Sequence, residues 1–271
     1  MKYCINYYKN FRHIDKIDEI IFDCNKKLLD KSFIEFVKNN IKQEQRVILS
    51  MVNDAEVVTM MLPIVNKLKE VHENYAIRTD IANAVNFQLK DKGYKFFLAE
   101  RCTDFDQVFS AIKYGSTDVY VTDQLGFNLM DVGTYAHEHN VKVRVLPNVA
   151  QSSIGILSQF PPENKFFIRP EDVDVYEPYV DVFELFGPED KLSVTYEIYQ
   201  EKEWRGPIGE LIIGINELFS LDGKHPFGQY RLNCRQVCYK CELCNRFREI
   251  NVITDKHNLK ITERKDEQIS E

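Results

Sequence analysis

Four cysteines near the C-terminal end of the sequence are the residues best suited to chemistry. They form a C-x3-C-x2-C-x2-C pattern within RLNCRQVCYKCELCNRF, and they are Cys234, Cys238, Cys241 and Cys244. Cysteine thiols are reactive and otherwise tend to be buried singly, so four of them this close together indicate a metal site. Basic side chains between and around them would stabilise thiolates and offset the charge of a tetrathiolate centre.

Two metal centres suit four thiolates, and the spacing leaves both open. Zinc binds four thiolates tetrahedrally, usually from two CxxC pairs that a longer loop separates. Iron–sulfur clusters use more compact runs, and we expect a 4Fe-4S cluster, with zinc as the alternative. The first three cysteines also have the spacing of a radical S-adenosylmethionine motif, but that motif normally follows an early barrel strand. A reduced loop without metal is the remaining interpretation.

The other cysteines, Cys4, Cys24 and Cys102, are scattered along the chain. A secreted protein would usually spread its cysteines to join distant segments, so an odd total with one tight cluster indicates an intracellular protein. The N-terminal residues lack the long apolar stretch of a signal peptide. No apolar run approaches the ~20 residues that a membrane span needs. We therefore expect a cytoplasmic protein with no membrane segment.

Polar side chains at the ends of apolar runs form a second group of candidates. We predict that the catalytic residues are Glu100, Asp123, Arg169 and Glu184, and that the substrate-binding residues are Arg78, Arg101, Asn148 and Gln151. A carboxylate at the end of an apolar strand either pairs with a cation or has a raised pKa. Arginine can pair with such a carboxylate or hold an anionic substrate. No Ser–His–Asp arrangement, nucleotide-binding loop or HExxH motif supports hydrolase or kinase chemistry.

Short β-branched and aromatic runs alternate with amphipathic segments, which predicts repeated β–α units. The predicted strands are Glu19–Cys24, Arg46–Met51, Tyr75–Thr79, Lys95–Glu100, Asp118–Asp123, Val141–Leu146, Lys165–Arg169 and Val180–Phe186. The predicted helices are Ser32–Gln43, Ala55–His72, Ile81–Lys92, Thr103–Tyr114, Asn128–His139, Glu171–Tyr179 and Glu189–Glu201. The nearly continuous hydrophobicity of the strands is typical of parallel strands covered on both faces.

Eight such units without a linker predict an α/β fold, a (β/α)8 TIM-barrel-like domain with a C-terminal cysteine-rich metal-binding extension. Two further runs, Lys2–Tyr8 and Glu210–Asn216, also have strand character. They could cap the barrel or pair with each other, or one could replace a strand assigned above. An open doubly wound sheet is the rival fold, and the absence of a Gly-rich loop after the first strand disfavours its nucleotide-binding form.

The expected domain organisation follows from this reading. Residues 1–203 form the barrel, residues 204–250 form a C-terminal strand and the tetracysteine segment packed on the barrel, and residues 251–271 form a polar tail. The polar composition of that tail is typical of frayed chain ends.

Composition and charge narrow the classes of partner. The 271 residues are 44% hydrophobic, which excludes a wholly disordered or collagen-like chain. A formal net charge of −7 disfavours generic DNA binding, because that affinity comes from neutralising phosphates. We expect a small-molecule or nucleobase substrate and no membrane partner.

The segment FFIRPEDVDVYEPYVDVFELFG, followed by the cysteine-rich stretch, resembles the late part of the peptidase U32 family. DVYVTDQLGFNLMDVGTYAHEHNVKVRVLPNVAQSS is similar to the middle repeats of that family's barrel, so the likeness covers roughly residues 95–245. The family's usual His-Gly after the last strand is Phe186-Gly187 here, the cysteines are more closely spaced, and the opening Pro-Ala-Gly turn is absent. The resemblance implies an iron–sulfur protein of the kind linked to oxygen-independent hydroxylation of RNA bases or quinone precursors, not a true peptidase.

Two functions of different classes follow. The first is an iron–sulfur enzyme that acts on a small molecule or nucleobase in the barrel mouth. The alternative is a non-enzymatic barrel whose cysteines hold structural zinc and whose surface serves assembly or partner binding. For the enzyme, we expect the four sulfurs to lie over the same mouth as Glu100 and Glu184, because a redox cluster must lie close to its substrate. Cys24 or Cys102 would then lie nearby as lone thiols.

Overall fold

Eight parallel strands form the centre of the protein in the computed structural model, which describes residues 1–24, 29–52, 54–121, 128–149, 167–204, 206, 208–213, 219–221, 227–232 and 252–254. The strands follow the order β5-β4-β3-β2-β1-β8-β7-β6. They are β1 (Lys2–Asn6), β2 (Glu19–Asp23), β3 (Arg46–Met51), β4 (Tyr75–Thr79), β5 (Phe96–Leu98), β6 (Asp118–Tyr120), β7 (Lys142–Val145) and β8 (Val182–Leu185).

The sheet curls until its two outer strands meet, so the barrel is nearly closed. Thr117 N, just before β6, donates to Phe96 O in β5 at 2.8 Å. Beyond the strands, Cys102 and Val121 form a parallel bridge, and Cys102 N donates to Tyr120 O at 2.6 Å. The prediction of an eight-stranded parallel barrel is confirmed, and the rival open sheet is wrong.

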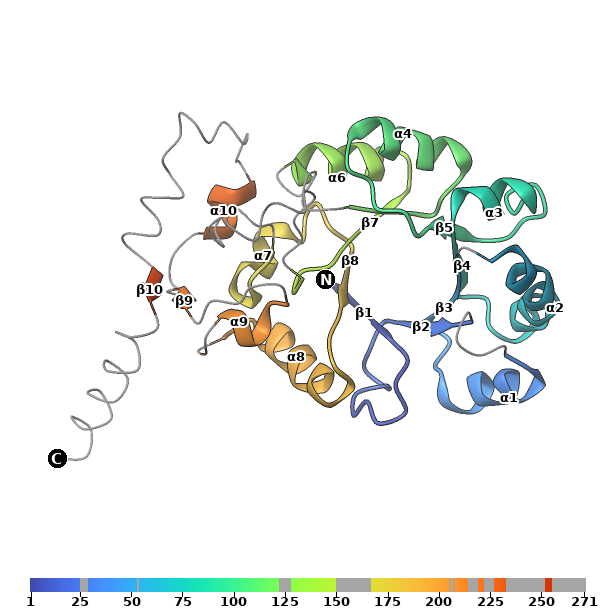
Figure 1. Cartoon of the computed structure of the whole chain (residues 1–271), viewed down its shortest axis with the longest axis horizontal. Helices are drawn as coiled ribbons and strands as arrows, with labels where there is room; N and C mark the ends of the chain where they lie inside the picture. Colours follow the sequence, from blue (N-terminus) through green and yellow to red (C-terminus); the bar gives the residue numbers. More distant parts are fainter. Residues whose placement is uncertain are drawn as a thin grey trace.

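Helices surround the strands, as Figure 1 shows. They are α1 (Lys31–Asn40), α2 (Ala55–Val71), α3 (Ile81–Asn86), α4 (Phe105–Tyr114), α6 (Leu129–Glu138), η3 (Pro170–Asp172), α7 (Val173–Tyr176) and α8 (Glu189–Glu201). The predicted helices agree within a few residues, except that α3 ends at Asn86 and turns continue to Gly93. None of the helices in the described part of the chain is long and apolar enough to cross a membrane.

The first four helices begin in the same way. Asp30, Asp54, Asp80 and Asp104 are the N-caps of α1, α2, α3 and α4, and each side chain accepts a hydrogen bond from a backbone N–H of the first turn. Such a cap satisfies one of the N–H groups that a helix leaves unpaired at its start, and its negative charge suits the helix dipole. Short-range chemistry therefore fixes where the chain turns from each strand into its helix.

One predicted strand is wrong in its described part. Phe167–Arg169 has no strand geometry, and β8 pairs directly with β7 through Arg144 and Val182, which leaves no gap in the sheet for another strand. The described part of this run keeps one backbone bond to the end of β7, from Ile168 N to Pro147 O at 2.9 Å. The eighth strand of the barrel is instead β1 (Lys2–Asn6), which lies between β2 and β8.

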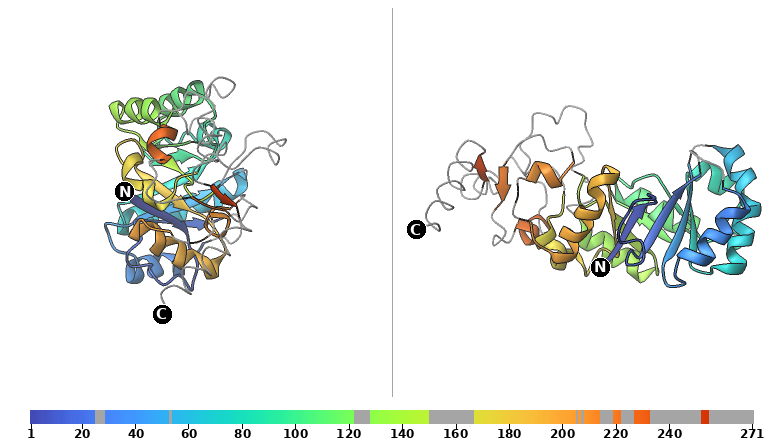
Figure 2. Two further views of the ribbon diagram at one scale, coloured as in Figure 1. Left: turned by 90° about the vertical axis from the view of Figure 1, so that its left-hand side faces the viewer. Right: turned by 90° about the horizontal axis from the view of Figure 1, so that it is seen from below.

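The chain beyond the barrel contains α9 (Ile208–Leu211), β9 (Phe219–Leu221), α10 (Phe227–Leu232) and β10 (Val252–Thr254). The predicted strand Glu210–Asn216 is wrong at its start, which is helical, but Ile213 forms a parallel bridge with Val149 beyond β7. β9 and β10 pair antiparallel and lie away from the barrel strands in the right-hand view of Figure 2. The domain boundaries at 203 and 250 stay a prediction.

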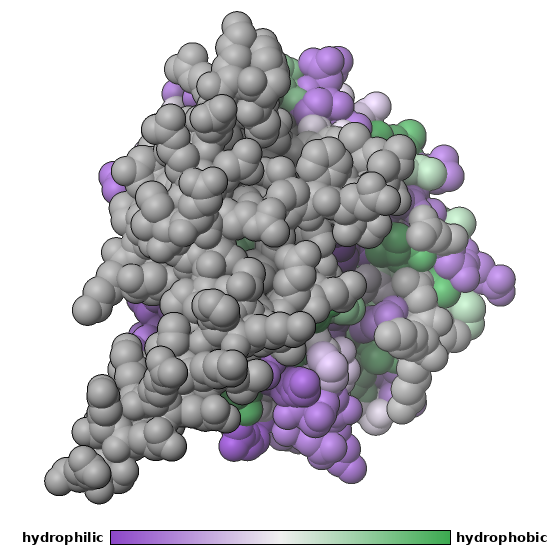
Figure 3. All heavy atoms as spheres, turned by 60° about the vertical axis from the view of Figure 1, so that its left-hand side comes forward, coloured by the Kyte–Doolittle hydropathy of each residue, from purple (hydrophilic) through white to green (hydrophobic). Residues whose placement is uncertain are grey.

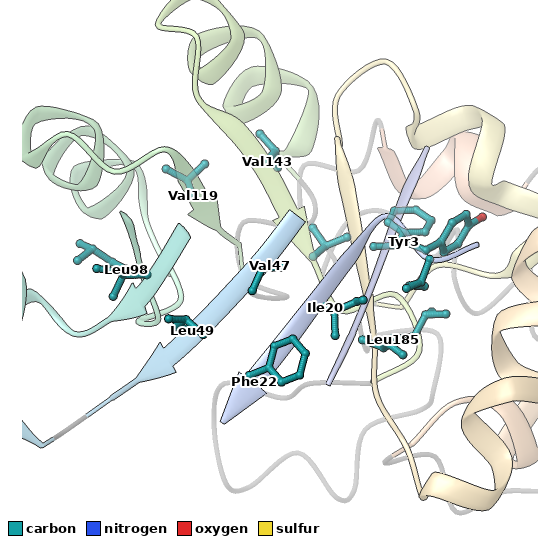
Figure 4. Packing of buried hydrophobic residues seen from close by; sticks show 14 of the residues in the cluster. Tyr3, Ile20, Phe22, Val47, Leu49, Leu98, Val119, Val143 and Leu185 are labelled. Atoms are coloured by element: carbon teal, nitrogen blue, oxygen red, sulfur yellow. The ribbon is translucent and has the colours of Figure 1, made fainter. Parts of the chain in front are cut away.

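Apolar side chains on alternate strand positions form the main core between strands and helices. Figure 4 shows part of it, with Ile20 and Val47 side by side on β2 and β3, and Val119 and Val143 on β6 and β7. On the surface drawn in Figure 3, hydrophobic and hydrophilic side chains of the described residues are mixed. The helix-facing core therefore uses one set of strand positions, and the other set faces the interior of the barrel.

Candidate active site in the barrel interior

The interior of the barrel is charged as well as apolar. A separate apolar cluster, Cys4, Ile21, Ile48, Ala76, Phe97 and Val182, occupies the strand positions that alternate with those of the main core. On the same strand positions lie Glu19, Arg46, Arg78, Asp118, Arg144 and Glu184. They pair across strands that are not neighbours in the sheet, such as β3 with β6 and β4 with β8, so the contacts pass through the barrel interior.

The N-terminal half of the interior holds the lower cluster, defined as Glu19, Arg46, Asp118 and Arg144. Arg46 Nη1 donates to Asp118 Oδ2 at 2.6 Å and to Oδ1 at 2.9 Å. Arg144 Nη2 donates to Asp118 Oδ2 at 2.9 Å and also to Glu19 Oε2. Arg46 Nη1 lies 3.5 Å from Glu19 Oε1. Two guanidinium groups and two carboxylates thus neutralise one another out of contact with solvent.

Burial alone would raise the pKa of Asp118, but the charges of Arg46 and Arg144 outweigh it and hold that pKa well below its usual value. The pKa of Glu19 is lowered in the same way, by Arg144 and Arg46 against the effect of burial. The same carboxylates raise the pKa of both arginines. All four groups are therefore charged in the folded protein at neutral pH.

The C-terminal half holds the upper cluster, defined as Arg78, Tyr120 and Glu184. Arg78 Nη1 donates to Glu184 Oε1 at 3.2 Å, and Arg144 Nη1 lies 3.6 Å from Glu184 Oε2. The Arg78 guanidinium carbon lies 5.4 Å from the centre of the Tyr120 ring. Burial, followed by the charge of Glu184, raises the pKa of Tyr120, so its hydroxyl keeps its proton.

Several polar atoms around the upper cluster have no hydrogen-bond partner among the described residues. They are Arg78 Nε, Tyr120 OH, Glu184 Oε2, and Nε and Nη1 of Arg144. The exposed fractions of Tyr120, Arg144 and Glu184 are 1%, 0% and 3%. A buried polar group without a partner costs about 1–3 kcal/mol, so such groups are usually satisfied by water or a ligand. These atoms can therefore donate hydrogen bonds to a bound water or ligand and accept hydrogen bonds from it.

The structure brings three of the predicted site residues together. Arg78 and Glu184 form the ion pair of the upper cluster. Arg101 lies near the same group, with its guanidinium carbon 5.3 Å from the centre of the Tyr120 ring. The Tyr120 ring thus contacts two arginines at the C-terminal end of β6, which is where this fold places its active sites.

Asn148 binds protein backbone. Its Nδ2 donates to Phe186 O at 2.6 Å, its Oδ1 accepts from Phe186 N at 3.0 Å, and its own carbonyl accepts from Ile213 N at 2.9 Å. Only 1% of Asn148 is exposed. It therefore fixes the chain after β8 and holds the segment that returns from α9.

Glu100 and Arg169 also contact the protein. Glu100 Oε1 accepts a hydrogen bond from Ile81 N at the start of α3, at 2.9 Å, and the residue lines a cavity of about 290 Å³ with Arg101. Arg169 binds Asp172 through Nε at 2.6 Å and Nη2 at 2.9 Å, and 2% of the residue is exposed. Asp172 Oδ1 in turn accepts from Gly228 N of α10 at 3.1 Å. Glu100 therefore links the segment after β5 to the start of α3, and Arg169 holds Asp172 of η3, which in turn binds α10.

The remaining predicted site residues lie outside the described residues: Asp123, Gln151, Cys234, Cys238, Cys241 and Cys244. In the part of the chain that the structure describes, no group of three or more His, Cys, Asp or Glu side chains is arranged to hold a metal ion. Among the lone cysteines, Cys24 and Cys102 follow β2 and β5 and are buried. Burial raises the pKa of each thiol to about 12, which keeps both protonated.

Our sequence reasoning missed Tyr120 and the lower cluster. Their signal was a charged or hydroxyl side chain at every second position of an otherwise apolar strand, as in VKVRVL and DVY. Because side chains alternate between the two faces of a strand, that pattern places charge in the interior of a closed barrel.

No family model matches this chain. It is 32% identical over 91 residues to the uncharacterized protease MJ1657 of Methanocaldococcus jannaschii, and that match covers 31% of this chain. The chain thus matches only 27% of that relative's length. The solved structure of the U32 peptidase Mk0906 aligns with a TM-score of 0.45 and 12% identity, over 70% of this chain and 94% of that chain. A distant resemblance to the peptidase U32 family is confirmed.

Proposed function

We propose that this protein is a U32-like iron–sulfur enzyme that acts on a small molecule or nucleobase in the mouth of its barrel. The observation that carries the proposal is the upper cluster: buried polar atoms of Arg78, Tyr120 and Glu184 lack hydrogen-bond partners among the described residues, in the C-terminal half of the barrel interior. A purely structural interior would pair them, as the lower cluster does. The distant resemblance to a family of named peptidases supports an enzyme, and the barrel mouth supports the location.

The upper cluster has distinct chemical roles to offer. Arg78, Arg144 and protonated Tyr120 can donate hydrogen bonds to oxygen atoms of a substrate. Glu184 is held through Oε1 by Arg78, while Oε2 lacks a hydrogen-bond partner among the described residues and can accept a hydrogen bond or a proton. Because these groups are buried, their electrostatic effect on a bound substrate is stronger than it would be in water.

The donor set of the four cysteines fits the cluster that the resemblance implies. Cys234, Cys238, Cys241 and Cys244 supply four soft thiolates that are close together in the sequence, as a 4Fe-4S cluster requires. When bound, such a cluster would supply one-electron redox chemistry. The residues of the barrel would bind and orient the substrate and move protons at Glu184.

A helix that docks on the barrel supports placing the cysteine segment near the mouth. α10 ends at Leu232, two residues before Cys234, and Leu232 is buried. Gly228 of α10 contacts Asp172 so closely that an added Cβ would lie 2.6 Å from Asp172 Cβ. Asp172 belongs to η3, whose preceding residues bond to Pro147 beyond the C-terminal end of β7. Chain connectivity thus starts the cysteine segment from the β7–β8 side of the barrel.

Anaerobic purification with iron, sulfide and zinc analysis tests the proposal. We expect a brown protein with stoichiometric iron and acid-labile sulfide. Cys238→Ser and Cys241→Ser should each lower bound iron, because thiolates hold the cluster and metal binding stabilises the segment locally. Cys24→Ala is the matched control, a buried cysteine outside the segment, and should keep its iron.

A colourless protein with one zinc per chain would overturn the proposed iron–sulfur enzyme in favour of the non-enzymatic barrel with structural zinc. Unchanged metal in both cysteine variants would reject the tetracysteine site altogether.

A further inference from the structure

Arg144 faces carboxylates of both clusters. Its Nη2 donates to Asp118 Oδ2 at 2.9 Å and also to Glu19 Oε2, in the lower cluster. Its Nη1 lies 3.6 Å from Glu184 Oε2 in the upper cluster, which is too far for a hydrogen bond. Arg144 is fully buried, and Nη1 has no hydrogen-bond partner among the described residues. One guanidinium group thus faces three carboxylates and bonds to two of them.

Strand register places two of these carboxylates on either side of one small residue. Cys4 of β1 pairs in register with Glu19 of β2 and with Glu184 of β8. Neighbouring strands lie about 4.8 Å apart, so the Cα atoms of the two glutamates are about 10 Å apart. Both side chains meet the Arg144 guanidinium inside the barrel. Glu19 and Glu184 therefore compete for the same cation.

Only a small shift separates this arrangement from one in which Arg144 binds Glu184. A charge-assisted N–H···O bond is about 2.7–2.9 Å long, so Nη1 would have to approach Oε2 by about 0.7–0.9 Å. Both atoms lack a hydrogen-bond partner among the described residues, so each would gain from the bond. The bonds from Nη2 to the lower carboxylates oppose the shift, because they hold the other end of the same planar group.

Neighbouring groups fix the lower end of this arrangement. Arg46 Nη1 donates to both oxygens of Asp118, so Asp118 is itself held in place. The Arg144 guanidinium carbon lies 4.7 Å from the centre of the Phe97 ring, which supports the guanidinium group. Asp118 and Glu19 are fully buried, so dissolved salt hardly screens their attraction for Arg144.

We propose that the lower cluster positions Arg144 and thereby keeps the second carboxylate oxygen of Glu184 available to a ligand. Glu19 and Asp118 act on the ligand-binding atoms through Arg144 and are therefore positioning residues. The inference rests on the proposed function only in taking the upper cluster as the substrate site. It gives a role in binding to residues at the N-terminal end of the barrel, which in this fold usually serves stability.

Removing one negative charge from the lower cluster tests the inference. Glu19→Gln keeps the shape of the side chain, and Asp118 still binds Arg46. In crystal structures of the wild type and the variant, we expect the distance from Arg144 Nη1 to Glu184 Oε2 to fall from 3.6 Å to about 2.9 Å. NMR of protein labelled with nitrogen-15 arginine gives a readout in solution, where the Arg144 Nη1 protons should move downfield. Arg144→Lys assigns these signals.

Two variants separate positioning from stability. Glu19→Asp keeps the charge and should leave the Arg144 Nη1 signals near their wild-type positions. Asp172→Asn is the matched control, because Asp172 is also a buried carboxylate but binds Arg169 and Gly228. It should not move the Arg144 signals. A purely structural role of Glu19 predicts lower stability in Glu19→Gln with unchanged Nη1 signals.

Double variants measure the coupling between the two clusters. Glu184→Gln should raise the equilibrium constant for unfolding about 3- to 30-fold more in the Glu19→Gln background than in the wild type, because Arg144 then depends on Glu184. The effects of Glu184→Gln and Asp172→Asn should be independent within about 2-fold. Urea unfolding of the full chain measures both.

The wild type alone provides a further check. Its Arg144 Nη2 protons, which are bonded to carboxylates, should lie downfield of the Nη1 protons. Nη1 protons that lie equally far downfield would show that Arg144 already binds Glu184, and would overturn the inference without any variant.

An unchanged distance from Arg144 to Glu184 in Glu19→Gln, or independent effects of Glu19→Gln and Glu184→Gln on unfolding, would also overturn it. The proposed function fails separately, because it is tested by bound iron. A protein that lacks iron yet shows the coupling would keep the positioning of Arg144 and lose the iron–sulfur enzyme.

Discussion

The two halves of the barrel interior both contain buried arginine and carboxylate side chains, but only the lower cluster uses its carboxylate oxygens fully in hydrogen bonds. In the lower cluster, Asp118 accepts from both Arg46 and Arg144, and Arg144 also binds Glu19. In the upper cluster, Glu184 has one hydrogen bond, from Arg78, and its second oxygen has none among the described residues. Arg144 belongs to both halves, since Nη2 binds the lower carboxylates and Nη1 faces Glu184.

The difference teaches that the type of a buried charged residue does not decide its role. The decisive property is whether its hydrogen-bonding capacity is already used. Breaking a satisfied buried ion pair leaves an uncompensated charge, so the lower cluster serves stability. In the C-terminal half of the barrel interior, polar groups without a hydrogen-bond partner among the described residues are available to bind a ligand. Such groups lower the stability of the protein, as is common at functional sites.

The largest expected effect is in the lower cluster. Asp118→Ala leaves Arg46 and Arg144 facing each other with only Glu19 between them, and should lower the free energy of unfolding by about 3–5 kcal/mol. Urea unfolding monitored by circular dichroism measures it. The control is Glu35→Ala, which removes an exposed partner of Lys38 on α1 and should change stability by no more than about 0.5 kcal/mol. A similar small change for both variants would show that the lower cluster does not hold the barrel together.

A pH series sharpens the same comparison. Because the pKa of Asp118 is lowered on folding, its ionised form favours the folded state, and the stability it contributes is present above its unfolded pKa of about 4. That contribution is lost as the pH falls through the lower folded pKa. The gap in unfolding free energy between the wild type and Asp118→Ala should therefore be constant above about pH 5 and shrink below about pH 4. A gap that widened in acid would contradict the assignment of Asp118 as a buried carboxylate.

The smallest expected effect compares a buried tyrosine hydroxyl that donates a hydrogen bond with one that has no hydrogen-bond partner among the described residues. Tyr199 OH donates to Ile168 O at 2.7 Å, whereas Tyr120 OH has no partner among the described residues. Both side chains are fully buried. Tyr199→Phe should cost about 1 kcal/mol, while Tyr120→Phe should cost nothing or stabilise the ligand-free protein, because it removes a buried hydroxyl that has no hydrogen-bond partner among the described residues. Thermal unfolding of the two variants measures the difference, and an equal cost would mean that Tyr120 is already satisfied.

Much of the barrel follows from local patterns. Strands such as RVILSM and helices such as Glu189–Glu201 were predicted with the observed boundaries, because periodicity and helix starts depend on residues a few positions apart. The run at Lys165–Arg169 shows the limit of this method. Its composition is as strand-like as that of Lys2–Asn6, and only the pairing of β8 with its two neighbours determines which run enters the sheet.

The candidate site was predicted in part. A carboxylate near the end of β8 and an arginine near the end of β4 were identifiable, because strand ends meet at one mouth in a parallel barrel. Strand register decided two contacts that lie far apart in the sequence. Glu184 pairs with Arg78, 106 residues away, and Asn148 binds the backbone of Phe186. Glu100 follows the C-terminal end of β5, at the same end of the barrel, where it bonds to the start of α3.

The sequence by itself therefore determined the repeated β–α units, since each is written in residues that are near neighbours along the chain. Only the tertiary structure decided which charged side chains satisfy one another. Arg46 meets Asp118 across 72 residues and Arg144 meets Glu19 across 125, and both pairs form inside a closed barrel. Closure fixes the register of all eight strands together, and a shift of one residue would turn every interior side chain to the opposite face.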